Sequence, residues 1–126
     1  MEYMTMICDI KNSKMLKNRE SIQYRLIKTI KEANKCFSSI ISSPFLIIIG
    51  DEWQGVLNYP CNYNAVLEFF HENMGEIDFY CGIGIGEILI HNFELTVNQL
   101  DGPSFYKARK AIKTAKEYNY NIVYIQ

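Results

Sequence analysis

Acidic side chains stand at two places where the pattern of apolar residues predicts that a strand ends. Asp9 follows the first apolar run of the chain, and Asp51 and Glu52 follow the run FLIIIG. Carboxylates from separate strands hold divalent cations against the phosphates of a nucleotide in many enzymes. Asp9 and Asp51 therefore predict a site where Mg²⁺ or Mn²⁺ holds phosphate groups. The alternative is structural, because acids also suit hairpin tips and turn caps.

The elements that would bring these acids together follow from the hydrophobic periodicity of the chain. Apolar runs bounded by turn residues predict strands at Tyr3–Cys8, Phe45–Ile49, Trp53–Asn58, Phe79–Ile90 and Asn121–Gln126. Helical spacing predicts one helix from near Asn18 to Ser42–Pro44, one from Pro60 to Gly75, and one that follows Asp101–Pro103. Glycines at every second position of CGIGIGE predict a strand that lies close to another backbone or to a ligand.

The order strand, helix, hairpin, helix, strand, helix, strand includes the β-α-β-β-α-β arrangement of a ferredoxin-like core. We therefore expect an α+β palm with a mainly antiparallel sheet covered by helices, forming a single domain over residues 1–126. The first strand of this topology lies beside the hairpin, so Asp9 and Asp51 become neighbours. A divalent cation between them would relieve their mutual repulsion.

The composition excludes several classes of protein. Lys and Arg number 13 and Asp and Glu 14, a formal net charge of −1, so no strong positive field is available to hold long nucleic acid. The N-terminal sequence MEYMTMICDI resembles neither a signal peptide nor a membrane span, and we expect a cytoplasmic protein. The cysteines lack the paired spacing of a zinc site and are expected to be free thiols, mostly buried: Cys8, Cys36, Cys61 and Cys81.

Five motifs resemble, in chain order, the SatD family. They are CDIKNSK at Cys8–Lys14, NRESIQ at Asn18–Gln23, GDEWQG at Gly50–Gly55, GIGIGEI at Gly82–Ile88 and DGPSFYKARKAI at Asp101–Ile112. That family is similar in fold to class III nucleotide cyclases, GGDEF cyclases and the polymerase-like palm of CRISPR complexes. The resemblance implies a palm that binds a divalent metal and a nucleoside triphosphate, and that needs a homodimer for cyclase chemistry.

The resemblance also implies roles for individual residues. The implied metal ligands are Asp9, the backbone carbonyl of Ile10, Asp51 and Glu52. The implied contacts to the triphosphate come from the loop Lys11–Lys14, including Asn12, Ser13 and Lys14, and from the late-helix cations Lys107 and Arg109. Turnover would use Asp9, Asp51 and Arg109 as catalytic residues.

The chain departs from the cyclase pattern on the late helix. Cyclases place an asparagine there and an arginine one turn later, whereas this chain has Phe105 or Tyr106 and then Arg109. The expected function is therefore either nucleotidyl transfer or cyclisation, or nucleotide binding by a catalytically inactive regulatory or partner-binding module. A palm whose acids serve only turns is a third possibility.

Several of these residues also have plain structural explanations. Arg109 could be solvated or paired with Asp101 or Glu87. Trp53 could line a base pocket, but a tryptophan in a hairpin strand more often packs in the core. An exposed helix face would account for the late-helix lysines, which are Lys107, Lys110, Lys113 and Lys116.

Overall fold

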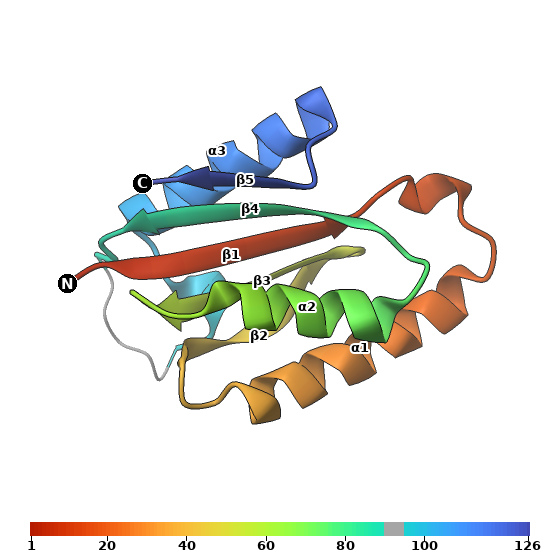
Figure 1. Ribbon diagram of the computed structural model, residues 1–126, viewed down its shortest axis with the longest axis horizontal. Helices are drawn as coiled ribbons and strands as arrows, with labels where there is room; N and C mark the ends of the chain where they lie inside the picture. The colour runs from red at the N-terminus through yellow and green to blue at the C-terminus, as the bar shows by residue number, and fades with distance from the viewer. Residues whose placement is uncertain (90–94) are drawn as a thin grey trace.

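Figure 1 shows the computed structural model, in which residues 1–89 and 95–126 are described. One five-stranded sheet has the order β2-β3-β1-β4-β5. Its strands are β1 (Tyr3–Ile10), β2 (Ile41–Ile49), β3 (Glu52–Asn58), β4 (Phe79–Gly86) and β5 (Ile122–Ile125). The helices are α1 (Arg19–Cys36), α2 (Tyr63–Met74) and α3 (Pro103–Tyr118), with short 3₁₀ helices η1 (Ser13–Met15) and η2 (Val97–Gln99).

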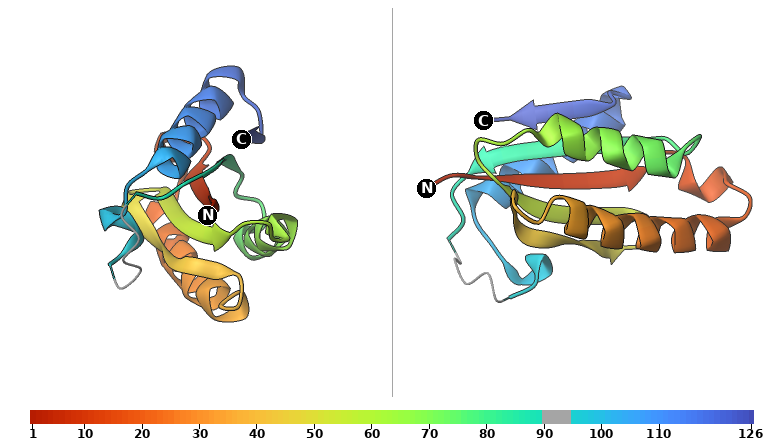
Figure 2. Two further views of the ribbon diagram at one scale, coloured as in Figure 1. Left: turned by 90° about the vertical axis from the view of Figure 1, so that its left-hand side faces the viewer. Right: turned by 60° about the horizontal axis from the view of Figure 1, so that its bottom comes forward.

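The central strand β1 pairs antiparallel with β3 on one side and with β4 on the other. The strands β2 and β3 form an antiparallel hairpin, and β5 adds to β4 in parallel. The expected α+β palm is therefore confirmed, including the position of β1 beside the hairpin. Helices α1 and α2 cover one face of the sheet, and α3 covers the other (Figure 2).

The face under α1 and α2 is packed with large apolar side chains. Every second residue of β1 from Met4 to Ile10 points into this core. The ring of Trp53 in β3 lies 5.6 Å from that of Phe70 in α2 and 5.3 Å from that of Phe79 in β4. Trp53 is fully buried, so the prediction that it packs in the core is confirmed.

On the face under α3, glycines of β4 allow the helix backbone to lie directly on that strand. A Cβ atom on Gly82 would lie 2.3 Å from the nitrogen of Ile112, and one on Gly84 would lie 2.2 Å from the nitrogen of Ala108. Ser104 Oγ fixes the start of α3 by donating to the Gly84 carbonyl at 2.9 Å. The alternate glycines of β4 therefore allow the backbone of α3 to pack closely on the strand. This agrees with the prediction that the strand lies close to another backbone.

Several boundaries differ from those predicted. Helix α1 ends at Cys36, and Ser42–Pro44 belongs to β2, because a proline is tolerated in an edge strand. Helix α2 begins at Tyr63 rather than at Pro60, after Asn62 caps it by accepting from Ala65 N–H. Strand β4 ends at Gly86, and the predicted end at Ile90 lies outside the described residues.

All four cysteines are free thiols, as predicted. Only Cys8 and Cys81 are buried, whereas Cys36 is exposed and Cys61 is partly exposed, so the expectation that most are buried is wrong. Cys36 is the last residue of α1 and lies outside the buried stripe of that helix. In the described part of the chain, no helix combines the length and the apolar character needed to cross a membrane.

Candidate metal and phosphate site

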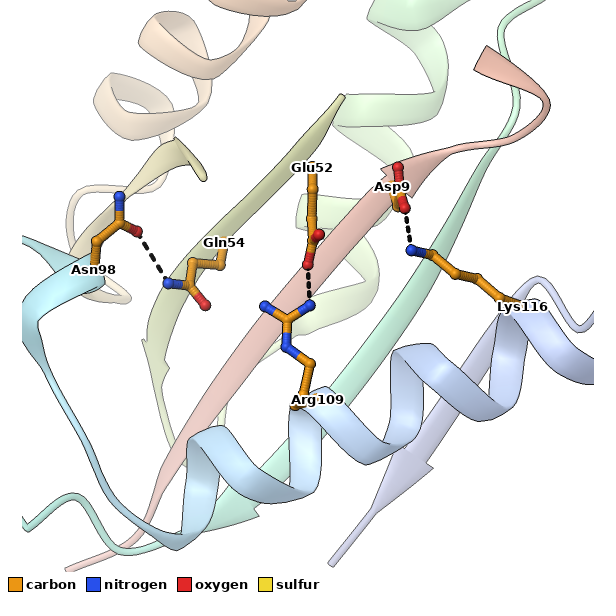
Figure 3. Close-up of polar contacts among 6 residues, drawn as sticks. All are labelled: Asp9, Glu52, Gln54, Asn98, Arg109 and Lys116. Carbon is orange, nitrogen blue, oxygen red and sulfur yellow. Dashed lines mark hydrogen bonds and ion pairs between the residues drawn. The ribbon is translucent and has the colours of Figure 1, made fainter. Parts of the chain in front are cut away.

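Strands β1 and β3 bring two of the candidate acids directly opposite one another. Asp9 and Glu52 are cross-strand partners, and both side chains lie on the face covered by α3 (Figure 3). Asp51 precedes Glu52 in the hairpin turn, where its carbonyl oxygen accepts from the N–H of Ile10 at 3.3 Å. The three acids thus lie at one end of the sheet, with Glu52 rather than Asp51 opposite Asp9.

Each of these acids is paired with a cation from a helix. The pairs are Asp9 with Lys116, Glu52 with Arg109, and Asp51 with Arg19. The side chains of Lys116 and Arg109 extend from α3 toward the sheet (Figure 3), whereas Arg19 is the first residue of α1. Arg109 therefore pairs with Glu52, and neither Asp101 nor Glu87 is the partner that the structural alternative suggested.

Burial raises the pKa of Asp9 above its ordinary value, and the nearby carboxylates of Glu52 and Asp51 raise it further. The ion pair with Lys116 lowers the pKa of Asp9 but does not compensate for burial. Asp9 is thus a carboxylate whose charged form would be stabilised by additional positive charge.

The donor set suits a hard divalent cation, because every candidate side-chain ligand is a carboxylate oxygen. Within residues 1–89 and 95–126, however, no three side chains of His, Cys, Asp or Glu are already grouped as metal ligands. The three acids instead face their helix cations. A metal would therefore be held by Asp9, Glu52 and Asp51 only after these ion pairs open.

An open depression of about 370 Å³ joins the acid of β1 to the loop that follows it. Its lining includes Asp9 and Ile10 at the end of β1 and Asn12, Ser13 and Lys14 in the loop that follows. Asn12 adopts a left-handed conformation with φ 52°, which turns the chain into η1. The loop residues expected to contact phosphate groups thus lie beside the first acid.

The structure does not bring Lys107 to this depression. Its Nζ donates to the carbonyl oxygen of Ile85 at 3.0 Å, near the far end of β4. Lys107 is also partly buried, whereas Lys110 and Lys113 are exposed as the sequence predicted. Of the two late-helix cations expected to contact phosphate, Lys107 and Arg109, only Arg109 reaches the acids.

Lys116 also lines the depression, and sequence reasoning had placed it on an exposed helix face. A signal was present, because Lys116 lies seven residues after Arg109, which corresponds to two turns of a helix. Both residues therefore flank the buried stripe of α3 on the same side. The partner strand of each cation could not be inferred from that spacing.

A third polar contact lies further along β3, on the same face as Glu52. The buried side chain of Gln54 donates from Nε2 to Oδ1 of Asn98 at 3.0 Å (Figure 3). This hydrogen bond holds η2 against the sheet, beyond the N-terminal end of α3.

Residues 3–125 match the family model described as the SatD family. The chain belongs to the SatD family. This assignment confirms the resemblance carried by the five motifs, and it covers all the acids and cations of the site. No curated protein sequence matches this SatD chain significantly.

Solved structures similar to this SatD chain are nucleotide cyclase and GGDEF domains. A bacterial light-regulated adenylyl cyclase is 11% identical, with a TM-score of 0.64 over 98% of this chain and 74% of its own. An EAL/GGDEF domain protein from M. capsulatus is 16% identical, with a TM-score of 0.62 over 99% and 85%. A guanylate cyclase domain from Catenaria anguillulae in complex with GTP is 15% identical, with a TM-score of 0.55 over 90% and 72%. These similarities establish the shared fold.

Proposed function

We propose that this SatD-family palm binds a nucleoside triphosphate through a divalent cation, Mg²⁺ or Mn²⁺. The observation that carries the proposal is the opposition of Asp9 and Glu52 on neighbouring strands, beside a depression that also contains Lys14 and Lys116. Carboxylates and cations are the two kinds of group that a metal–triphosphate complex requires. A neighbour with the same fold is described in complex with GTP, which supports this ligand class.

In this proposal the acids hold the metal and the loop holds the phosphates. Asp9, Asp51 and Glu52 supply carboxylate oxygens, and the backbone carbonyl of Ile10 is an additional candidate ligand. The side chains of Asn12, Ser13 and Lys14 face the same depression and would donate to phosphate oxygens. A bound divalent cation would neutralise charge on the phosphates and position them beside these donors.

Nucleotidyl transfer or cyclisation is the second candidate function. A ribose 3′-hydroxyl would attack the α-phosphorus of the triphosphate, forming a new P–O bond and releasing pyrophosphate, while Asp9 and Asp51 hold the metal. Arg109 is the late-helix residue available to stabilise the developing charge. Because cyclase-like palms imply a site built between two copies, we expect this activity only from a homodimer.

The binding proposal is tested by thermal unfolding with Mg²⁺ or Mn²⁺ and each nucleoside triphosphate. Ligand at about 100 times its Kd adds roughly 2.7 kcal/mol to the free energy of unfolding, so Tm of the wild-type chain should rise by several degrees. Asp9→Asn and Asp51→Asn should lose this rise. Glu117→Gln, which removes an exposed carboxylate elsewhere on α3, should keep it. An equal rise in all four proteins would show that the acids do not hold the metal.

Mass spectrometry of the products separates the two candidate functions. Cyclic or linked nucleotides would establish turnover, which should then be lost in Asp9→Asn. Unchanged triphosphate together with a retained rise in Tm would establish a binding module.

A further inference from the structure

The candidate metal ligands are already neutralised by cations of this chain. The pairs are Lys116 with Asp9, Arg109 with Glu52, and Arg19 with Asp51, the last at 3.9 Å between Nη2 and Oδ2. Three carboxylates therefore face three cations, and the cluster has no formal net charge. A bare divalent cation would find no unbalanced negative charge there, and the displaced helix cations would remain beside it.

The two members of each pair differ in freedom to move. The side chains of Asp9 and Glu52 are 18% and 15% exposed, whereas those of Lys116 and Arg109 are 42% and 51% exposed. The acids are fixed on the sheet, and the cations stand on long, solvated side chains at the edge of α3. An exchange of partners would thus move the cations and leave the strands in place.

The position of Lys116 shows where its new partner would lie. Its side chain lines the same depression as Ser13 and Lys14, so a phosphate group held by the loop would lie within reach of Lys116. Lys116 can turn from Asp9 toward this phosphate without crossing the core, because it already lies at the surface. A polyphosphate would then replace the carboxylate as its partner.

Building on the proposed function, we propose that the site takes up a divalent cation only together with a polyphosphate, with Lys116 exchanging its carboxylate partner Asp9 for a phosphate partner. The metal neutralises the acid that Lys116 releases, and the polyphosphate neutralises Lys116. Each component binds weakly alone because it leaves one set of charges unpaired. Metal and polyphosphate binding are therefore positively coupled through Lys116.

Calorimetric titration can measure this coupling with Mn²⁺ and inorganic tripolyphosphate, which has no base or ribose. The wild-type chain should bind preformed Mn²⁺–tripolyphosphate at least about tenfold more tightly than either component alone, within the usual range of coupling between sites. Lys116→Met frees Asp9, so it should bind bare Mn²⁺ more tightly and the complex more weakly. Lys116→Arg retains the charge and should restore the wild-type preference for the complex.

Lys113→Met is the matched control, because Lys113 is exposed on the same helix and does not line the depression. It should bind like the wild type. The proposal is overturned if bare Mn²⁺ binds the wild type as tightly as the complex does, or if Lys116→Met leaves their ratio unchanged. Tight bare Mn²⁺ binding that is lost in Asp9→Asn would overturn this inference and leave the proposed function intact. Absence of binding by any protein would also overturn this inference, whereas the proposed function fails only if Mn²⁺ with a nucleoside triphosphate leaves the Tm of the wild type unchanged.

Discussion

The two faces of the sheet use the same strands for different purposes. Under α1 and α2, alternate residues are large and apolar, and Trp53, Phe45 and Phe70 fill a continuous aromatic core. Under α3, glycines and polar side chains alternate with a few apolar ones such as Ile7, and Asp9 and Glu52 are paired with helix cations. The comparison indicates that packing energy is concentrated on one face, which leaves the other face free to carry charges that a ligand can rearrange.

Phe70→Ala should produce the largest effect, because it removes a fully buried ring from the aromatic core. The ring of Phe70 lies 5.2 Å from that of Phe45 and 5.6 Å from that of Trp53. We expect the free energy of unfolding to fall by about 3–5 kcal/mol, measured by chemical denaturation. Phe105→Ala, at a partly buried position on α3, should cost less. Equal losses would contradict the proposed division between the faces.

Gly84→Ala should have the next largest effect, and it tests the opposite face. The added methyl group would lie 2.2 Å from the nitrogen of Ala108 and 2.4 Å from the carbonyl oxygen of Ser104, so α3 must move. Overpacking of this kind costs about 1–3 kcal/mol and can cost more.

Gly86→Ala is the matched control for this substitution, since its nearest contact would be 3.0 Å. It should destabilise the chain less than Gly84→Ala does in the same denaturation experiment. If the two variants are equally stable, the helix is not fixed by backbone contact at Gly84.

Asp9→Asn should have the smallest effect on stability and the opposite sign. Burial raises the folded-state pKa of Asp9 above its unfolded value. Its contribution to stability is then fully present below the ordinary Asp pKa of about 3.9 and is lost as pH rises through the raised pKa. The variant avoids this loss, so in chelator-treated buffer at neutral pH its Tm should exceed that of the wild type by a few degrees.

The difference in Tm between Asp9→Asn and the wild type should shrink as the pH falls toward 4 and the wild-type Asp9 becomes protonated. If Asp9→Asn instead has a lower Tm than the wild type at neutral pH, the pair with Lys116 outweighs burial. Glu117→Gln, at an exposed position on α3, is the matched control for the loss of a carboxylate.

The fold could be predicted from the sequence because local patterns determine its elements. The apolar run to Cys8, the glycines of β4 and the stripe of α3 each indicated the correct element. The boundary at Ser42–Pro44 was wrong because polar residues and a proline resemble a helix stop, yet they are accommodated in the edge strand β2.

The candidate site was only partly accessible to sequence reasoning. Asp9, Asp51 and Glu52 could be identified because they follow apolar runs that predict strands. The opposition of Glu52 to Asp9, however, depends on the register of β1 with β3. The pairs of Arg109 and Lys116 depend on where α3 crosses the sheet, which the glycines of β4 determine by allowing close approach. Such contacts join residues far apart in the chain and leave no local pattern.

The alternation along β3 links the aromatic core to the direction in which the acids point. Trp53 lies between Glu52 and Gln54, so a slip of one residue in the pairing with β1 would turn the indole toward α3 and drive a carboxylate into the hydrocarbon interior. The free-energy cost of burying that carboxylate holds β3 in its observed register. Trp53 therefore fixes the register of β3 against β1. Its replacement should weaken the alignment of Asp9 with Glu52 before it unfolds the domain.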